Sequence, residues 1–263
     1  MTSPQSPATA LQLLELALRA ARSCAKEIAG HGIPTVAGRK TSTTDPVTDA
    51  DRAGEAVIRR IIKAERAEDG LLGEEGSSEP SLSGLRWVFD PLDGTVNYLY
   101  RIPHWAVSVA CERFENETWQ TISGVVYDAT REETFSAVRG GGAFLNDVPI
   151  VVNQEVHLSD ALVATEFSYR PESRLLQAGL LARVLPRVRD IRSSGSSALD
   201  LCWVAAGRWD GFYENELSRW DWSAASLIVE EAGGAVSPLG TGVVAGSRSV
   251  LRMLRELVAP DAA

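Results

Sequence analysis

The chain has 263 residues, enough for one large domain or two modest lobes with a sizeable core. Hydrophobic residues make up 44% of it and charged residues 23%, proportions that exclude a disordered or fibrous protein. The formal net charge of -9 argues against a nucleic-acid ligand, because phosphate backbones are bound by basic surfaces. If the substrate is itself anionic, a cation must lie between it and the protein, and a metal ion is the economical candidate.

The start of the chain predicts an amphipathic helix over residues 11–25, which four polar or charged side chains interrupt. A helix interrupted in this way is neither a signal peptide nor a membrane span. We therefore expect a cytoplasmic protein that does not bind membranes.

The cysteines and histidines show no metal-binding or redox motif. The cysteines are odd in number and far apart, which favours reduced, packed thiols over a disulfide framework: Cys24, Cys111 and Cys202. The histidines are isolated along the chain, which favours structural roles: His31, His104 and His157.

The first half of the chain mixes helical and antiparallel strand patterns. Residues 30–45 are typical of a loop, and residues 48–65 predict a helix that Thr48 or Asp49 caps. Alternating or apolar runs joined by short turns then favour an antiparallel meander over residues 106–113, 121–127 and 133–138. The glycines at 140–142 could cradle a phosphate or turn a hairpin, and a hairpin is favoured because a strand pattern follows them.

The second half, from about residue 155, alternates strands with helices. Strands are predicted at residues 161–167 and 209–214, and helices at residues 173–186, 196–206 and 222–232. Alternation of this kind is typical of an α/β lobe.

Carboxylates recur where predicted elements begin or end, at Asp51, Glu74, Asp90, Asp93 and Asp221. Each alone could cap a helix or lie in solvent. Asp90 and Asp93 differ, because the apolar strand pattern at 87–89 ends at Asp90 and both acids, three residues apart around Pro91, can point at one place. Like charges so close are costly unless a hard cation lies between them, and oxygen-only ligands select magnesium or manganese over zinc.

Gly94 and Thr95 follow these acids and complete a hydrolytic pattern. A glycine lets the backbone approach a ligand, its neighbouring N–H groups can hold an oxyanion, and the hydroxyl of Thr95 could position a water. Together these parts predict metal-assisted attack of water on a phosphate ester. Phosphatases that form an aspartyl-phosphate carry D-x-D-G-T, whereas Pro91 stands two residues before Asp93 here, which favours direct attack by water.

The stretches FDPLDGTVNYLYRIPHWAVSVA (89–110) and WDWSAASLIVEEAGG (220–234), with LLGEE upstream, resemble the inositol monophosphatase family of magnesium-dependent, lithium-sensitive phosphatases. The similarity covers nearly the whole chain. It implies an α+β protein with the layered αβαβα sugar-phosphatase fold. An N-terminal α+β lobe (1–152) would carry most metal ligands, and a C-terminal α/β lobe (153–263) would add Asp221 and substrate contacts. Family members are usually homodimers, so we expect a homodimer.

The resemblance also implies roles for individual residues. Two or three Mg²⁺ ions, for which Mn²⁺ can substitute, would be bound by Glu74, Asp90, the backbone carbonyl of Leu92, Asp93 and Asp221. Catalysis is assigned to Thr95, Asp51 and Glu74. Substrate binding is assigned to Gly94, Thr95, Lys40, Arg192, Gly195, Ser196, Glu214 and Asp221.

Members of this family hydrolyse several small phosphate esters. Residues 184–214 look most like bacterial inositol-1-monophosphatases of the actinobacterial type, and Glu214 suits a partner of inositol hydroxyls. The resemblance therefore implies hydrolysis of a small phosphorylated polyol, inositol-1-phosphate, to myo-inositol and phosphate. The alternatives are histidinol phosphate, fructose 1,6-bisphosphate, NADP or adenosine bisphosphate as substrate, or an additional partner-binding role. Ser223 stands where the family usually has Ala or Cys, and we expect it to loosen the packing of its helix.

Overall fold

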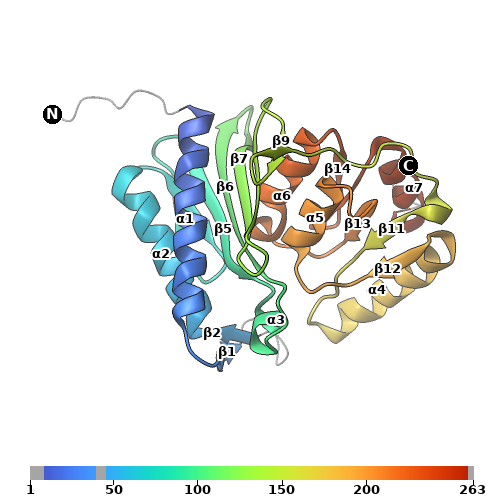
Figure 1. Cartoon of the computed structure of the whole chain (residues 1–263), viewed down its shortest axis with the longest axis horizontal. Helices are drawn as coiled ribbons and strands as arrows, with labels where there is room; N and C mark the ends of the chain where they lie inside the picture. The colour runs from blue at the N-terminus through green and yellow to red at the C-terminus, as the bar shows by residue number, and fades with distance from the viewer. Residues whose placement is uncertain (1–8, 40–45, 260–263) are drawn as a thin grey trace.

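The structure, a computed structural model, describes residues 9–39 and 46–259 and has the layered αβαβα arrangement predicted from the sequence (Figure 1). Among these residues, three pairs of long helices alternate with two sheets. The pairs, in layer order, are α1 (Ala10–Gly30) with α2 (Asp49–Glu65), α5 (Ser197–Ala205) with α6 (Arg219–Glu231), and α4 (Pro171–Val184) with α7 (Arg248–Val258). The shorter helices are α3 (Thr95–Leu99), η1 (Leu158–Asp160) and η2 (Leu185–Arg187).

The larger sheet has the strand order β10-β9-β8-β7-β6-β5-β3-β4 and is antiparallel except for the pair β3 and β5. Its strands are β3 (Gly70–Gly73), β4 (Ser78–Glu79), β5 (Leu85–Asp93), β6 (Ala106–Glu115), β7 (Thr118–Asp128), β8 (Glu133–Val138), β9 (Ala143–Leu145) and β10 (Val148–Pro149). The run β6 to β8 confirms the predicted meander, and the glycines at 140–142 turn the hairpin between β8 and β9.

The smaller sheet has the order β12-β11-β13-β15-β14, with parallel pairs on both sides of β11. Its strands are β11 (Leu162–Ala164), β12 (Asp190–Arg192), β13 (Gly211–Glu214), β14 (Ala235–Leu239) and β15 (Gly242–Gly246). A third, two-stranded sheet pairs β1 (Val36–Arg39) with β2 (Pro46–Thr48). The prediction of loop throughout 30–45 is therefore wrong at β1, and α7 had no counterpart among the predicted elements.

Buried apolar side chains fill the spaces between the layers. One cluster packs α1 and α2 on the larger sheet, and another packs α4 and α7 on the smaller sheet. The third surrounds α5 and α6 and includes Val88 from the larger sheet and Phe212 from the smaller one. Because this cluster draws on both sides of residue 152, the division into two lobes there stays a prediction.

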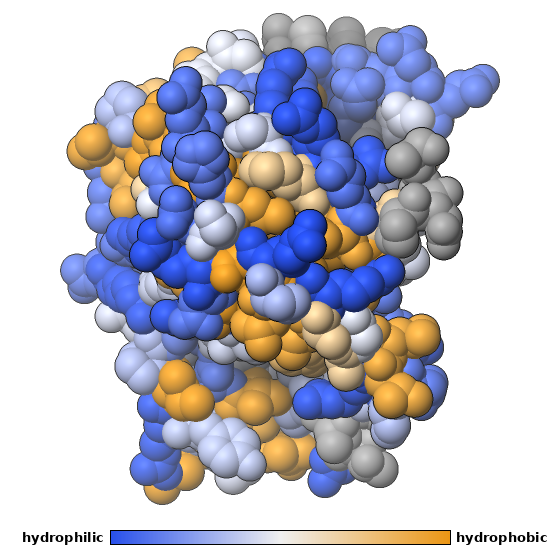
Figure 2. Space-filling view, turned by 90° about the vertical axis from the view of Figure 1, so that its right-hand side faces the viewer, coloured by the Kyte–Doolittle hydropathy of each residue, from blue (hydrophilic) through white to orange (hydrophobic). Residues whose placement is uncertain are grey.

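The cysteines are packed as the sequence predicts, and the surface includes some exposed apolar side chains. All three cysteines are buried and free, as predicted. No helix among residues 9–39 and 46–259 is both long enough and apolar enough to cross a membrane. Figure 2, which faces the end of the molecule where α4 and α7 lie, shows apolar residues between charged ones. On α4, Leu175 and Leu176 are exposed, so this helix is less strictly amphipathic than α1.

Candidate active site

A cavity of about 700 Å³ lies between the end of β5 and the loops of the second half. Its lining includes nine of the residues assigned to the site from the sequence: Glu74, Asp90, Leu92, Asp93, Gly94, Thr95, Gly195, Glu214 and Asp221. These residues come from both halves of the chain, so the fold brings them together.

The two acids of the D-P-L-D stretch lie on β5 and not beyond it. The pairing of β5 with β6 shifts by one residue between them, so that Asp90 lies opposite Ser108 and Asp93 opposite Ala106. Residues three apart in a regular strand face opposite sides of a sheet. The extra residue cancels this, because Ser108 and Ala106 are two apart and face the same side. The predicted strand end at Asp90 is therefore wrong, and the irregularity turns both carboxylates to one pocket.

Gly94 joins β5 to α3 in a conformation that glycine adopts without strain, with φ at 101°. A Cβ there would lie 3.1 Å from the carbonyl oxygen of His104 and 3.2 Å from that of Gly195. The close approach leaves no room for a side chain. Glycine at 94 thus permits the loop that carries Gly195 to lie directly against the start of α3.

Thr95 and Asp51 form a buried pair beside the acids. The Thr95 hydroxyl donates to Asp51 Oδ1 at 2.9 Å and lies 3.1 Å from the carbonyl oxygen of Leu92. The other oxygen of Asp51 accepts from the backbone N–H and the hydroxyl of Thr48, the N-cap of α2. Asp51 is fully buried and held on both sides, so it fixes the direction of the Thr95 hydroxyl.

Glu74 lies in a turn that another acid shapes. The two oxygens of Glu55, on α2, accept the N–H groups of Glu75 and Ser77, each at 2.7 Å. Glu55 is buried and had no role predicted from the sequence. Its carboxylate fixes the turn that brings Glu74 to the pocket.

Asp93 and Asp221 each accept hydrogen bonds at the N-terminus of a helix of the second half. Asp93 Oδ2 accepts from Ser196 Oγ at 2.6 Å and from the backbone N–H of Ala198 at 2.8 Å, at the start of α5. Asp221 Oδ2 accepts from the backbone N–H of Ser218 at 2.7 Å, in the capping box of α6. Helix N-termini stabilise carboxylates, so the fold supports both negative charges.

Burial and mutual repulsion disfavour the charged forms of these acids. The pKa of Asp90 lies well above its usual range because burial desolvates the carboxylate and because Glu74 and Asp93 add negative charge. Burial also raises the pKa of Asp93 to about 7, although the hydrogen bonds from Ser196 and from the backbone of Ala198 act to lower it. The pKa of Glu214 is raised by burial and then by Glu166. A divalent cation among such groups would relieve the repulsion.

The predicted ligands fit a hard divalent cation, because four carboxylates and a carbonyl supply oxygen alone. No group of three or more His, Cys, Asp or Glu in the described part of the chain is arranged to hold a metal ion. The ligand set therefore stays a prediction.

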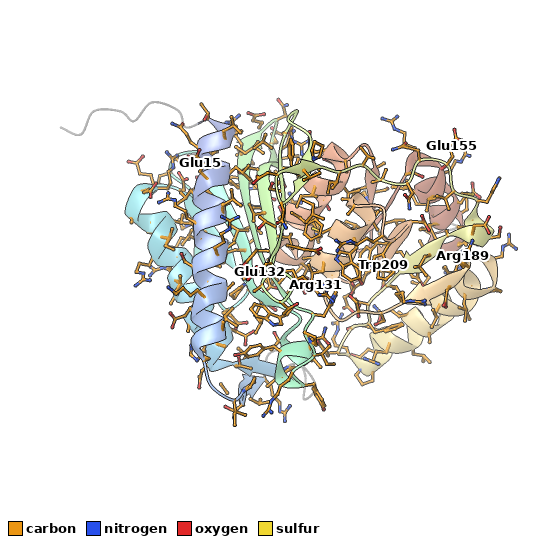
Figure 3. All side chains as sticks on the ribbon, in the orientation of Figure 1. Glu15, Arg131, Glu132, Glu155, Arg189 and Trp209 are labelled. Atoms are coloured by element: carbon orange, nitrogen blue, oxygen red, sulfur yellow. The ribbon has the colours of Figure 1, made fainter. Side chains whose placement is uncertain are left out.

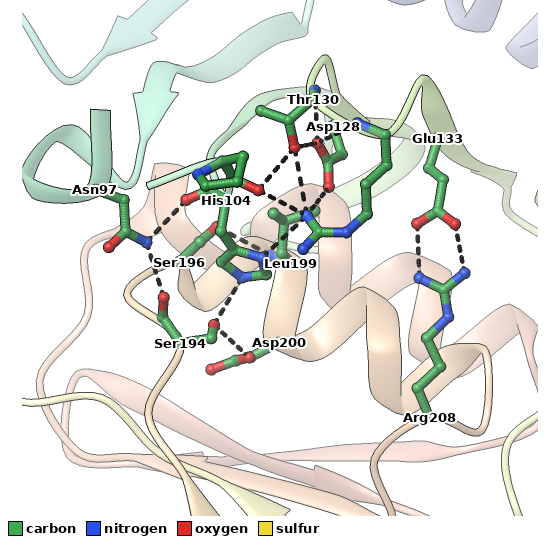
Figure 4. Close-up of polar contacts among 12 residues, drawn as sticks. Asn97, His104, Asp128, Thr130, Glu133, Ser194, Ser196, Leu199, Asp200 and Arg208 are labelled. Carbon is green, nitrogen blue, oxygen red and sulfur yellow. Dashed lines mark hydrogen bonds and ion pairs between the residues drawn. The ribbon is translucent and has the colours of Figure 1, made fainter. Parts of the chain in front are cut away.

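A chain of hydrogen bonds joins the two halves beside the pocket (Figure 4). Arg131 Nη1 lies 3.2 Å from His104 Nδ1, His104 Nε2 lies 2.8 Å from Ser194 Oγ, and Ser194 donates to Asp200 Oδ1 at 2.7 Å. A guanidinium can only donate, so Nδ1 of His104 accepts and its Nε2–H donates to Ser194. Burial and the charge of Arg131 lower the pKa of His104 to about 4, which keeps the ring neutral.

Asn97 reinforces this junction from α3. Its Nδ2 donates to the carbonyl oxygens of His104 and Ser194, at 2.8 Å each. Beside it, the Arg131 guanidinium lies 5.2 Å from the ring of Trp203, which in turn lies 5.1 Å from that of Trp209. Figure 3 shows Arg131 and Trp209 on facing parts of the two halves. The junction is therefore both hydrogen-bonded and packed.

Three of the described residues that were assigned to the site do not line the cavity. Asp51 and Ser196 are buried behind the wall, where they contact Thr95 and Asp93. Arg192 is partly exposed and pairs with Asp190 at 2.6 Å, away from the lining. Lys40 lies outside the described residues.

The cavity also contains residues that the sequence reasoning missed. Glu166, Arg170 and Glu216 line it. Glu166 lies at the end of the predicted strand 161–167, so the rule that found Asp90, an acid at a strand end, could have found it. Arg170 and Glu216 carry no comparable local signal.

Ser223 does not loosen α6 as expected. Its side chain is buried, donates to Glu112 Oε1 at 2.7 Å and lies 2.9 Å from the hydroxyl of Thr121. Arg219, at the start of the same helix, also donates to Glu112 at 2.6 Å. Glu112 thus holds the helix that presents Asp221.

Comparisons with known proteins agree with this geometry. The family model described as "Inositol monophosphatase family" matches residues 9–261. The chain is 40% identical to an inositol-1-monophosphatase of Rhizobium meliloti, over 81% of this chain and 83% of the relative. It is 36% identical to the Nus factor SuhB of Haemophilus influenzae, over 93% of this chain and 95% of the relative. The crystal structure of the extragenic suppressor protein suhB from Bartonella henselae superposes with a TM-score of 0.86 at 33% identity, over 95% of this chain and 99% of that one.

Proposed function

This chain belongs to the inositol monophosphatase family, and on that premise we propose that it is a magnesium-dependent phosphomonoesterase that hydrolyses inositol-1-phosphate to myo-inositol and phosphate. The observation that carries the proposal is the gathering of Glu74, Asp90, Asp93 and Asp221 around one cavity, next to the Thr95–Asp51 pair. Crowded, buried acids beside an oriented hydroxyl suit hydrolysis by a directed water.

Thr95 and Asp51 orient the nucleophile in this proposal. The Thr95 hydroxyl proton points to Asp51, so the lone pairs of Thr95 Oγ1 are left to accept a hydrogen bond from the attacking water. Asp51 cannot turn away, because Thr48 holds its other oxygen. The water is thereby aimed from the side of Thr95 towards the phosphorus.

The main-chain N–H groups of Gly94 and Thr95, at the first turn of α3, would hold phosphate oxygens. The predicted ligands Glu74, Asp90, Asp93 and Asp221, with the carbonyl of Leu92, would bind Mg²⁺ or Mn²⁺. When bound, the ions supply positive charge that polarises the phosphate and makes the water more acidic.

Glu214 supports a polyol as leaving group. Its carboxylate is buried in the lining of the cavity, where Ser197 Oγ donates to it at 2.9 Å. A carboxylate accepts hydrogen bonds from hydroxyls, which a polyol supplies in number. Relatives that carry the name inositol-1-monophosphatase, such as that of Rhizobium meliloti, support the same substrate.

A panel of substrates at fixed Mg²⁺ tests this assignment. We expect kcat/KM to be highest for inositol-1-phosphate among inositol-1-phosphate, histidinol phosphate and fructose 1,6-bisphosphate. A kcat/KM at least tenfold higher for another ester would make that ester the substrate in place of inositol-1-phosphate, and the proposed phosphatase chemistry would still hold. Asp93→Asn should abolish turnover, and a normal rate in that variant would refute the role of Asp93.

We also propose that the protein is a lithium-sensitive, cytoplasmic homodimer, as the resemblance implies. A second role as a binding partner of another protein is supported by relatives that are named Nus factor SuhB. Complementation of a deletion strain with the Asp93→Asn form tests that role, because full rescue without turnover requires a non-catalytic function.

A further inference from the structure

The wall of the cavity carries far more negative than positive charge. Its acidic members among the described residues are Glu74, Asp90, Asp93, Glu166, Glu214, Glu216 and Asp221. The one basic residue in the described part of this wall is Arg170. Four of the acids are the predicted metal ligands. The other three come from the half of the chain where the leaving group of the substrate would bind.

The charge of Arg170 is already compensated within the protein. Arg170 is the N-cap residue of α4, and its guanidinium forms an ion pair with Glu216, which lies between β13 and α6. About half of the Arg170 side chain and a quarter of the Glu216 side chain are exposed, at 51% and 25%. The pair therefore sits at the edge of the cavity, where a substrate would meet it.

The segments that carry this pair are held together without it. Gln177, a buried residue of α4, accepts from the backbone N–H of Ser168 at 2.9 Å and donates to Asn215 Oδ1 at 3.1 Å. Ser168 Oγ accepts in turn from the backbone N–H of Arg170 at 3.1 Å. Removal of the carboxylate of Glu216 should thus leave Arg170 at the edge of the cavity, with its charge free.

We propose that the Arg170–Glu216 pair sets the substrate class of the phosphatase site, restricting it to esters whose leaving group carries hydroxyls but no second phosphate. The proposal rests on the proposed function. A phosphate carries a charge of about -1.5 to -2 at pH 7, and a free arginine binds it through two parallel hydrogen bonds. Glu216 occupies that arginine. Glu216 also repels a second phosphate, whereas Glu166 and Glu214 can accept hydrogen bonds from hydroxyls.

The test compares Glu216→Gln with the wild-type chain, both at fixed Mg²⁺. The substrates are inositol-1-phosphate and inositol 1,4-bisphosphate, which differ by one phosphate, with fructose 1,6-bisphosphate as a second bisphosphate. In the variant we expect the ratio of kcat/KM for a bisphosphate to that for the monophosphate to rise at least tenfold, chiefly through a lower KM. Adding Arg170→Ala to the variant should remove the rise.

The matched control is Glu172→Gln, which removes one negative charge two residues from Arg170. Glu172 is exposed and does not line the cavity, so the ratio should stay within twofold of the wild type. Far-UV circular dichroism checks folding, and Glu216→Gly replaces Glu216→Gln if the latter does not fold.

The outcomes separate this inference from the proposed function. A ratio unchanged with both bisphosphates in a folded Glu216 variant overturns the inference, as does a wild-type chain that already prefers a bisphosphate. A wild-type chain without activity on any of the three esters would instead overturn the proposed phosphatase function.

Discussion

Asp93 and Ser196 lie 103 positions apart in the chain, yet Ser196 Oγ donates to Asp93 Oδ2 at 2.6 Å. One of the predicted metal ligands therefore also accepts hydrogen bonds at the N-terminus of α5, whose N-cap is Ser196. The position of its carboxylate depends on how α5 packs against β5. We therefore expect that any metal binding by Asp93 depends on this contact.

Ser196→Ala removes both a helix cap and a hydrogen bond to Asp93. We expect a loss of about 1 kcal/mol in the free energy of unfolding, the usual cost of losing a cap. The concentration of Mg²⁺ that gives half-maximal activity should rise, because Asp93 is less well oriented. Urea unfolding and a Mg²⁺ titration measure the two effects. Ser196→Thr retains the hydroxyl and should therefore keep most of the unfolding free energy and most of the affinity for Mg²⁺. Equal losses of stability and Mg²⁺ affinity in the two variants would contradict the role of the hydroxyl.

Asp90→Asn separates metal binding from folding. Asp90 is 2% exposed and faces the charges of Glu74 and Asp93. Its neutralisation should raise the melting temperature in EDTA, because a buried repulsion disappears. Addition of Mg²⁺ should stabilise the wild type and not the variant, which should also lose turnover. Thermal unfolding with and without Mg²⁺ checks this, and equal stabilisation of both proteins by Mg²⁺ would exclude Asp90 as a ligand.

Glu112 should be among the most sensitive positions outside the cavity. It is fully buried and accepts from Arg86 and Arg219 at 2.6 Å each, as well as from Ser223. Glu112→Gln leaves two cations without their carboxylate, and we expect a loss of about 3 kcal/mol in unfolding free energy. Ser223→Ala should cost about 1 kcal/mol. Urea unfolding measures both, and a larger effect for Ser223→Ala than for Glu112→Gln would contradict this ranking.

His104 should make the stability depend on pH between about 6.5, the pKa of an unperturbed histidine, and about 4, its value in the fold. Arg131 faces the ring and disfavours its protonation, whereas Asp128 favours it, and Asp200 lies beyond Ser194. As the pH falls through this window the unfolded chain binds a proton that the folded chain excludes, so stability decreases.

His104→Gln removes this titration, and its amide can still both donate and accept. From pH 7 to pH 5, the wild type should lose on the order of 1 kcal/mol more unfolding free energy than the variant, with screening by solvent included. Urea unfolding at the two pH values gives the difference. Parallel losses in the two proteins would contradict the lowered pKa of His104, because they would show that the folded and unfolded chains bind its proton equally.

Much of the fold follows from local patterns. The buried stripe of α1, from Leu13 to Ile28, has helical spacing, and the strands β6 to β8 have apolar or alternating runs joined by short turns. Each of these patterns depends on residues that are neighbours in the chain. Element types and the acids at their ends were therefore predictable. β1 is short and mostly exposed, whereas α7 was missed although its buried residues Val250, Leu254 and Val258 have helical spacing.

The sequence by itself determined the family, the order of the main elements and the acids of the site, because motifs such as D-P-L-D-G-T and the period of apolar residues are local properties. Only the tertiary structure decided which side chains meet. The shifted register opposite β6 turns Asp90 and Asp93 to one face, Arg192 falls outside the cavity, and Arg170 meets Glu216 across 46 positions. Side-chain direction depends on the register with partner strands and on packing between layers, and these contacts join residues that no local pattern connects.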